Sequence, residues 1–392
     1  MRENWSYKKL GEVASYINGY AFKPEQWTTS GTPIVRIQNL NNPNAPFNYF
    51  SGEVPDKVKI KNGDLLISWS ASLGAYIWQG GDAFLNQHIF KVDFNKLDID
   101  KMFLKYAVTS KLNVMAGLVH GATMKHIVKK DFDNTFIPFP SRKEQELIVA
   151  ELDKINELIS LKKAQLSDLD ALVQSLFSDM FGDPVLNEKG WEVKQLSEIS
   201  SLISNGNTPK GGSEVYVDSG YLFLRSQNVW KNRIDLEDVA YIDDATHKKL
   251  KKSTLMHNDL LITKTGRFNT ENSSLGRTAL FEGEDGSANI NGHVYLVRLK
   301  SGMIHKFVLY ILISDSYRDL IRKTCVGGID KRQLNKDHIE DFPIIFPPIE
   351  LQSDYVKKVE LIEKQKQKIG LIINDLETLL ASRMQFWFEQ LS

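Results

Sequence analysis

The segment WSYKKLGEV at residues 5–13 returns as WEVKQLSEI at residues 191–199. Further matches follow in the same order, and the spacing between partners grows along the chain, as loop insertions require. They pair IVRIQNL at 34–40 with FLRSQNV at 223–229, GDLLIS at 63–68 with NDLLIT at 258–263, NQHI at 86–89 with NGHV at 291–294, and FP at 139–140 with FP at 346–347. An internal repeat of this length predicts two related domains in one chain.

Each copy opens with short β-type runs that Gly, Asn and Pro interrupt, and apolar residues with helical spacing follow at 101–110 and 304–321. Strands are expected at 33–37, 64–69, 75–78 and 89–92 in the first copy and at 221–224, 260–264, 278–281 and 294–299 in the second. The sequence therefore predicts an α+β fold with two sheet-rich globular domains.

Each copy closes on one long helix. Ser141 and Glu144 form a capping-box signature, apolar periodicity continues to Phe181, and Gly182 and Pro184 end it. The apolar seam advances in alternating steps of four and three, as in a coiled coil. Its positions are Ile148, Leu152, Ile155, Ile159, Lys162, Leu166, Leu169, Val173, Leu176 and Met180, then Tyr355, Val359, Ile362, Lys366, Ile369, Ile373, Leu376, Leu380, Arg383 and Trp387.

A single apolar seam needs a partner in water, and the nearest partner for each helix is the other helix of the same chain. The chain connection predicts antiparallel packing with approximate two-fold symmetry, and Lys162 and Lys366 are candidates for fixing the register. The expected order is a first globular domain at 1–140, a central spacer helix at 141–184, a second globular domain at 185–348 and a C-terminal spacer helix at 349–392.

The composition indicates a folded globular protein of 392 residues, with 42% hydrophobic and 25% charged residues. No apolar stretch is long enough to span a bilayer and the N-terminus has no signal core, so we expect a cytoplasmic protein without membrane contact. The lone cysteine, Cys325, excludes an internal disulfide framework and a structural zinc site, and is expected to be buried. Basic and acidic residues both number 49, so a nucleic-acid binder would need its cations clustered on one face.

Two similar domains at the ends of a rigid spacer present two similar surfaces at a fixed separation. DNA offers sites at fixed spacing, and symmetric DNA-binding proteins match them with two half-sites one helical turn or more apart. The loops differ between the copies while the framework matches, which suits two half-sites of different sequence.

Six segments, most of them repeated in the second copy, resemble in their order the specificity subunit of type I restriction-modification enzymes over essentially the whole chain. These segments are LGEV at 10–13, RIQN at 36–39, NGDLL at 62–66, NQH at 86–88, GATMKHI at 121–127, and IPFP at 137–140 leading into Glu144 and Gln145.

The resemblance implies two target recognition domains, each reading one half of a bipartite site in double-stranded DNA, with the helices as spacers. It also implies assembly with two adenine-methylating subunits and with restriction subunits that translocate and cleave. S-adenosylmethionine, ATP and Mg²⁺ are then expected in those partners, and no cofactor or metal in this chain. The second copy departs from the pattern, because VGGIDKR at 326–332 replaces the Gly-Ala-Thr segment, so a DNA contact shared by both copies is not implied there.

Loop residues of the types that contact bases and phosphates are the DNA-binding candidates. They are Arg36, Gln38, Asn39, Ser68, Trp69, Ser70, Lys125, His126, Arg225, Gln227, Asn228, Lys264, Thr265, Arg267, Lys331 and Arg332. The Arg-x-Gln-Asn residues recur in both copies, so a structural or phosphate role suits them as well as base reading. The segments 68–72 and 263–267 differ between the copies and are better candidates for specificity, while a solvated loop is the alternative for them and for the remaining cations.

Two other functions stay open at this point. An adenine methyltransferase needs a glycine-rich nucleotide loop and an Asn-Pro-Pro-aromatic turn, and neither occurs, nor does a Walker loop, so we expect no catalytic residues. A nuclease activity fused to the reader is harder to exclude, because carboxylate clusters have no fixed spacing. A coiled-coil scaffold whose end domains bind proteins would fit the long helices equally well.

Overall fold

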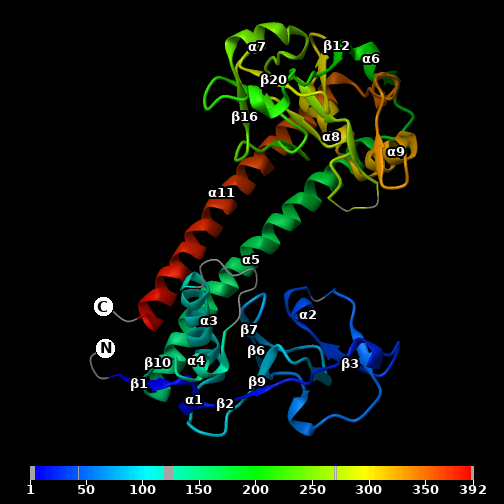
Figure 1. Ribbon diagram of the computed structural model, residues 1–392. Coiled ribbons are helices and arrows are strands. Elements are labelled where there is room, and N and C mark those ends of the chain that lie inside the picture. The colour runs from blue at the N-terminus through cyan, green and yellow to red at the C-terminus, as the bar shows by residue number, and fades with distance from the viewer. Residues whose placement is uncertain (1–4, 43, 119–126, 269, 271, 390–392) are drawn as a thin grey trace. The chain divides into compact units, whose positions relative to one another are not determined.

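The computed structural model describes residues 5–42, 44–118, 127–268, 270 and 272–389. The chain forms two compact units: unit 1 comprises Met1–Ala164 with Ile369–Ser392, and unit 2 comprises Gln165–Lys368. Each unit combines sheets with helices, and each takes a segment from both long helices, α5 (Arg142–Phe181) and α11 (Ile349–Phe388) (Figure 1). The domain boundaries at 140, 184 and 348 follow the sequence repeat and stay a prediction.

Unit 1 contains two four-stranded sheets. The first is antiparallel, in the order β2 (Ser15–Asn18), β9 (Ile89–Asp93), β6 (Leu65–Ser68) and β7 (Gly74–Ile77). The second has the order β4 (Asn48–Phe50), β3 (Thr32–Val35), β8 (Ala83–Leu85) and β5 (Lys59–Ile60), with β3 and β8 parallel. A short pair, β1 (Ser6–Lys9) with β10 (Phe136–Phe139), joins the two ends of the repeat.

Unit 2 repeats this topology. Its main antiparallel sheet has the order β12 (Ser200–Asn205), β21 (Val294–Leu299), β17 (Leu260–Thr263) and β19 (Thr278–Leu280). A second sheet has the order β16 (Ala240–Ile242), β13 (Tyr221–Leu224) and β20 (Ala288–Ile290), with β13 and β20 parallel, and β11 (Val193–Gln195) pairs with β24 (Pro343–Ile345). The duplicated sequence therefore folds into a duplicated arrangement of strands.

The remaining elements are short, apart from helix α3 of unit 1. The other helices are α1 (Leu10–Val13), α2 (Ile37–Asn41), α3 (Lys101–Leu118), α4 (Lys129–Asp133), α6 (Leu196–Ile199), α7 (Asp244–Lys249), α8 (His305–Leu312), α9 (Asp315–Thr324) and α10 (Lys336–Glu340). The other strands, all in unit 2, are β14 (Val229–Trp230), β15 (Arg233–Ile234), β18 (Thr265–Arg267), β22 (Val326–Gly327) and β23 (Lys331–Gln333). Single 3-10 turns occur at Pro24–Gln26, Asp56–Val58, Gly212–Val215 and Lys251–Ser253.

The predicted strands all form, with small differences at their ends, and both stretches with helical spacing are helical. The stretch 304–321 divides into α8 and α9 because the Ser314 hydroxyl accepts a hydrogen bond from the backbone N–H of Tyr317 and caps a new helix. The predicted strand at 33–37 stops at Val35, since the side chain of Asn39 binds the backbone N–H of Arg36 and starts α2. A local polar cap overrides the apolar pattern in both places.

Helix α5 begins and ends where the sequence predicts. The Glu144 carboxylate accepts hydrogen bonds from the backbone N–H and the hydroxyl of Ser141, at 3.0 and 2.7 Å. Gly182 has a positive φ of 77° and donates its N–H to the carbonyl of Ser178, which ends α5. Each long helix has 40 residues, which corresponds to a length of about 60 Å.

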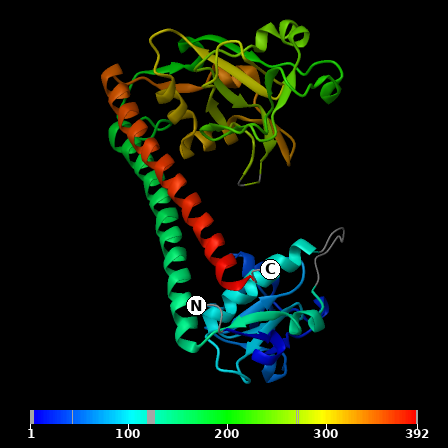
Figure 2. The same cartoon turned by 90° about the vertical axis from the view of Figure 1, so that its left-hand side faces the viewer.

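The helices run antiparallel where they meet in each unit (Figure 2). In unit 1, Lys163 Nζ lies 2.7 Å from Glu377 Oε1, and Arg383 pairs with Glu151 further along. In unit 2, Lys366 Nζ lies 2.6 Å from Asp170 Oδ1. Every predicted seam position is buried or half-buried, so the heptad pattern is confirmed, and Lys366 holds the partner helix through an ion pair.

The ends of the long helices complete the core of each unit. In unit 1, Trp387 stacks on Trp5 with the ring centroids 5.8 Å apart, and the rings of Phe388 and Phe103 lie 5.2 Å apart. In unit 2, Phe177 and Phe181 of α5 pack against Phe307 and Tyr355. The last turns of α11 therefore belong to the core of the first copy of the repeat, although they follow the second copy in sequence.

The same turn precedes β6 and β17 and is held by one aspartate in each copy. Asp64 accepts a hydrogen bond from the backbone N–H of Lys61 and pairs with Lys91 at 3.1 Å. Asp259, which is almost fully buried, binds the N–H of Met256 and pairs with Arg298 at 2.7 Å. The Gly-Asp and Asn-Asp match in the sequence therefore marks a structural ion pair.

Cys325 is buried and free, as expected. Within the part of the chain that the structure describes, no helix combines the length and apolar character needed to cross a membrane.

One glycine in each copy is required because two backbone segments come very close. A Cβ at Gly19 would lie 2.2 Å from the carbonyl oxygen of Asn86, and a Cβ at Gly206 would lie 2.2 Å from that of Ile290. In both units this contact joins the end of the first strand of the main sheet to the Asn-x-His turn.

Replacing Gly206 with alanine should therefore destabilise unit 2 by about 1–3 kcal/mol, the usual cost of forcing extra atoms into a packed site. The midpoint of thermal unfolding, followed by circular dichroism, measures this effect. The matched control is Gly370→Ala, since Gly370 lies in α11 with open space around its Cβ position and should gain up to about 1 kcal/mol in helix propensity. Equal midpoints for the two variants would contradict the close approach.

Candidate nucleic-acid interface

The candidate loops of each copy meet at one place, which we name the strand-end site because it lies at the C-terminal end of β6 or β17. In unit 1, the backbone N–H of Trp69 binds the carbonyl of His88 at 3.4 Å, and Ile127 N–H binds the carbonyl of Trp69 at 3.0 Å. In unit 2, Lys264 N–H binds the carbonyl of His293 at 2.8 Å, and Leu334 N–H binds the carbonyl of Lys264 at 2.9 Å. Three sequence-distant segments are thus brought together in the same way in both units.

The strand-end site of unit 1 is uncharged over the residues that the structure describes between 68 and 72. Ser68 is fully buried, and its hydroxyl donates to the carbonyl of Ser72. Ser70 is also buried, while Trp69 packs against His88 and Phe90 with ring centroids 5.4 and 5.6 Å away. Both candidate serines therefore shape the loop. The candidates Lys125 and His126 lie outside the described residues.

The strand-end site of unit 2 carries a small extra sheet that unites two groups of candidates. Strand β18 pairs antiparallel with β23, which places Arg267 opposite Lys331 and Gly266 opposite Arg332. Strand β22 pairs with the other edge of β23. Thr265 starts β18, and its hydroxyl oxygen lies 3.5 Å from Nδ1 of His293.

The cations of this sheet are not neutralised by acidic neighbours. The guanidinium of Arg332 stacks 3.8 Å from the ring centre of Phe268, and the ammonium of Lys264 lies 5.7 Å from that of Tyr295. Across the described residues, no carboxylate forms an ion pair with Lys264, Arg267, Lys331 or Arg332. Elsewhere in unit 2, Lys306, Lys336 and Lys366 each pair with a carboxylate oxygen at 2.6–2.9 Å.

A net charge of zero therefore does not prevent a local cluster of cations. Lys264, Arg267, Lys331 and Arg332 lie near one another at the strand-end site of unit 2, without a carboxylate partner among the described residues. Unpaired cations are what phosphate contacts require, because binding releases the counterions that DNA condenses.

The recurring Arg-x-Gln-Asn residues have structural partners in both copies. Asn39 is buried, its carbonyl oxygen accepts from the N–H of Arg36, and its amide donates to the carbonyls of Ala45 and Pro46 at 3.1 and 3.3 Å. The Gln38 amide also donates to Pro46, and the guanidinium of Arg36 donates to Asn48 at 3.1 Å.

The second copy builds the same tether from different partners. Asn228 is buried, binds the N–H of Arg225 at 2.9 Å and donates to the carbonyls of Asp235 and Asp238 at 3.0 Å. The Asp238 carboxylate accepts from Gln227 at 2.8 Å and pairs with Arg225, and these two contacts lower its pKa. The geometry supports the structural interpretation of these residues, and DNA contact by their remaining groups stays a prediction.

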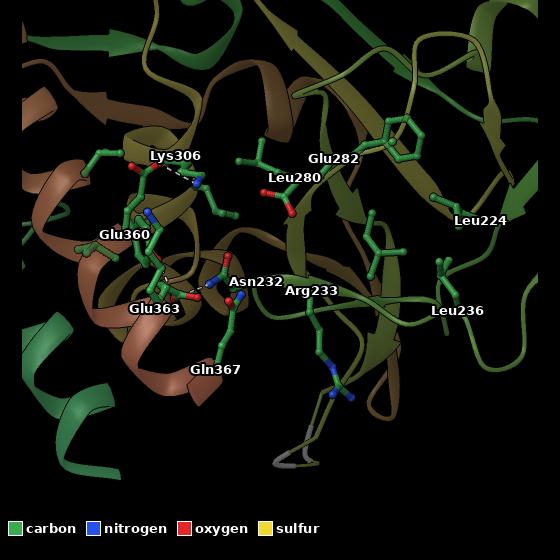
Figure 3. Close-up of a pocket in the computed structure, with 18 of the residues that line it drawn as sticks. Leu224, Asn232, Arg233, Leu236, Leu280, Glu282, Lys306, Glu360, Glu363 and Gln367 are labelled. Atoms are coloured by element: carbon green, nitrogen blue, oxygen red, sulfur yellow. Dashed lines mark hydrogen bonds and ion pairs between the residues drawn. The ribbon is translucent and has the colours of Figure 1, made fainter. Parts of the chain in front are cut away.

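The sequence did not predict a set of hydrogen bonds between each sheet domain and one long helix, which we name a joint. In unit 2, the Glu363 carboxylate of α11 accepts hydrogen bonds from the Asn232 amide at 3.2 Å and the Tyr310 hydroxyl at 3.0 Å, and Glu360 pairs with Lys306 at 2.9 Å (Figure 3). Burial and the neighbouring Glu363 raise the pKa of Tyr310 far above its usual value. These groups line a cavity of about 830 Å³, with Leu224, Leu236 and Leu280 on its apolar side.

Unit 1 contains an equivalent joint. The Tyr106 hydroxyl of α3 donates to Asp153 of α5 at 2.5 Å and accepts from the Asn156 amide at 3.0 Å. Because the carboxylates of both joints are already engaged, we interpret them as structural links and not as reaction centres. One sequence signal could have revealed these joints. Each copy has a tyrosine within an apolar helix, Tyr106 or Tyr310, and polar residues at matching positions of the long helix that it contacts.

The comparison with protein families matches both halves of the chain. Residues 2–171 and 188–377 fit the model of the type I restriction modification DNA specificity domain. The chain belongs to this family. The two matches also confirm that the sequence repeat is a repeat of this domain.

Relatives of this specificity subunit share its full length at low identity. The EcoBI specificity subunit of Escherichia coli is 22% identical over 97% of this chain and 85% of its own length. The MjaVIII specificity subunit of Methanocaldococcus jannaschii is 22% identical over 93% of this chain and 89% of its own length.

Solved structures share the fold. The S subunit of a type I restriction-modification system from M. genitalium aligns with a TM-score of 0.53 and 16% identity over 99% of this chain and 97% of that chain. A chain from a structure describing complex assembly and conformational transition of the type I R-M system aligns with a TM-score of 0.60 and 16% identity, over 98% and 97%.

Membership in this family makes the chain a specificity subunit, the component that recognises DNA without catalysing its modification or cleavage. Over the residues that the structure describes, no group of three or more His, Cys, Asp and Glu side chains is arranged to hold a metal ion.

Replacing Lys331 with alanine should weaken DNA binding to a similar degree for all sequences, because a phosphate contact carries no sequence information. The slope of log Kobs against log salt should fall by about 0.9, the value for one lost phosphate contact. Gel-shift titrations at several salt concentrations measure both. Lys336→Ala is the matched control, since Lys336 pairs with Glu340 and should leave the slope unchanged. A loss restricted to one base sequence would instead indicate base reading by Lys331.

Proposed function

We propose that this specificity subunit reads a bipartite target in double-stranded DNA, with one half-site bound by the strand-end site of each unit. The observation that supports this is a shared backbone frame with different side chains. The same hydrogen bonds hold Trp69 in unit 1 and Lys264 in unit 2, while the accessible polar side chains that follow them are Ser72 in unit 1 and Thr265 and Arg267 in unit 2. A constant frame with exchanged side chains suits two half-sites of different sequence.

The proposal includes partner subunits that supply the chemistry. Two methyltransferase subunits would use S-adenosylmethionine to methylate adenine in the target, and restriction subunits would use ATP and Mg²⁺ to translocate and cleave DNA. The E. coli relative is named as a subunit of a type I restriction enzyme, which supports such an assembly. A cytoplasmic location of the complex is part of the same proposal and agrees with DNA as its target.

The long helices offer a surface for these partners. Several leucines outside the seam are exposed and are available for contacts with such partners. They are Leu147, Leu161 and Leu172 on α5 and Leu361, Leu371 and Leu379 on α11.

Selection from random duplexes, with the chain and its methyltransferase subunits together, tests the proposed function directly. We expect a consensus of two short defined sequences separated by a gap of fixed length and unspecified sequence. Binding without sequence preference would contradict the proposal and favour a scaffold. Methyl transfer by the isolated chain would contradict the assignment of the chemistry to partners.

Lengthening the helix pair should change the number of unspecified base pairs between the two half-sites and leave the sequence of each half-site unchanged. One heptad inserted in α5 after Ala164 must be matched by one in α11 after Lys368, so that the antiparallel seam keeps its register. Seven residues add about 10 Å, or about three base pairs of gap. The consensus selected by the variant measures the change. The control inserts two residues at the same points, which turns the following seam positions by about 200°, away from the partner helix, and should impair assembly. An altered half-site sequence in the heptad variant would show that the units do not read independently.

A further inference from the structure

The hairpin of β22 and β23 in unit 2 presents an apolar tip. Gly328, Ile329 and Asp330 join the two strands, and the Ile329 side chain is 88% exposed, more than any other large hydrophobic side chain in the described part of the chain. Covering an isoleucine typically gains about 1.5–3 kcal/mol, so a residue left this exposed favours contact with a partner.

The shape of the hairpin is fixed by its backbone. Gly327 has a positive φ of 137°, and a Cβ there would lie 2.7 Å from the carbonyl oxygen of Lys331. The N–H of Phe268 binds the carbonyl of Asp330 at 2.9 Å, which ties the tip to the end of β18. Ile329 is therefore carried on a turn that is built into the sheet.

Cations flank this tip, which indicates the chemistry of the partner. Lys331 and Arg267 lie opposite each other on neighbouring strands, and Arg332 follows, all without a carboxylate partner among the described residues. Asp330 is the one acidic residue of the hairpin. An apolar tip with unpaired cations along one side matches a nucleic acid, in which base edges lie next to phosphates.

The major groove of DNA is about 12 Å wide and about 8.5 Å deep, and it admits β-strands. Gly327 and Arg332 are the last paired residues of the hairpin, so Ile329 lies in the turn beyond the strands, at the end that would meet the groove floor. The apolar group on that floor is the 5-methyl group of thymine, and the carboxylate of Asp330 suits the neighbouring N4 amino group of a cytosine.

We propose that Ile329 is a specificity residue that contacts the 5-methyl group of one thymine in the half-site read by unit 2. This inference rests on the proposed function, because it assigns one base contact within that half-site. Lys331 and Arg267 hold the flanking phosphates, and the hairpin is the element that enters the groove.

Deoxyuridine provides the test, because it lacks only the 5-methyl group of thymine. Each thymine of the selected target is replaced singly by deoxyuridine, and Kd is measured for the chain with its methyltransferase subunits. In one half-site, one replacement should weaken binding of the wild type about fourfold, the effect of one buried methyl group. Ile329→Ala should bind the thymine and deoxyuridine targets equally. The exposed side chain makes loss of folding by this variant unexpected. Leu186→Ala, at another exposed apolar residue of unit 2, is the matched control that should keep the fourfold difference.

Four outcomes would overturn the inference, and they are distinct from failure of the proposed function. A bipartite consensus with no deoxyuridine effect at any position would leave the function standing without this contact. A deoxyuridine effect that persists in Ile329→Ala would assign the methyl group to another residue. If no deoxyuridine replacement affects the wild type and Ile329→Ala binds every target more weakly, the Ile329 side chain would instead insert between base pairs. Loss of methyltransferase binding by Ile329→Ala would place a protein on the tip. Absence of any sequence preference would contradict the proposed function itself.

Discussion

The apolar seam shared by α5 and α11 is the constraint on which both units depend. The apolar seam of each helix would face water if the helix stood alone, and in each unit the antiparallel partner helix covers it. Because of this pairing, the last turns of α11 reach the core of unit 1, where Trp387 stacks on Trp5. The first half of α11 likewise places Tyr355 against Phe177 and Phe181 in unit 2. Neither unit would have a closed core without helix segments from both copies of the repeat.

Each sheet domain combines a frame that is alike in both copies with loops that differ between them. The frame consists of the Asp64 and Asp259 ion pairs, the close contacts at Gly19 and Gly206, and the buried amides of the Arg-x-Gln-Asn stretches. These groups form their hydrogen bonds, ion pairs and close contacts within the frame, so they hold the strand ends in place whichever residues the loops contain. The loops can then differ, as a serine loop does from a cationic sheet, without disturbing the fold. Such an arrangement suits a family of proteins that differ in the DNA sequence they recognise.

Charge is organised locally in this protein. Equal numbers of acidic and basic residues give no net attraction to DNA, yet most of the exposed lysines discussed above are neutralised by carboxylates on the same or a neighbouring helix. The cations of the β18–β23 sheet stack on aromatic rings or face one another instead. A local cluster of cations without carboxylate partners can bind phosphates although the net charge of the chain is zero.

The sequence by itself determined the repeat, the strands and the two long helices with their caps and seam, because these features depend on local periodicity and on residues close together in the chain. It also pointed to the loops that meet at the strand-end sites. Only the tertiary structure decided which candidate side chains face inward. Ser68, Ser70, Asn39 and Asn228 are buried and bind backbone groups that are set by chain folding, which their polar character did not reveal. The joints at Glu363 and Asp153, and the pairing that places Arg267 beside Lys331, likewise join residues far apart in sequence, and only the packing of the sheets against the helices brings them together.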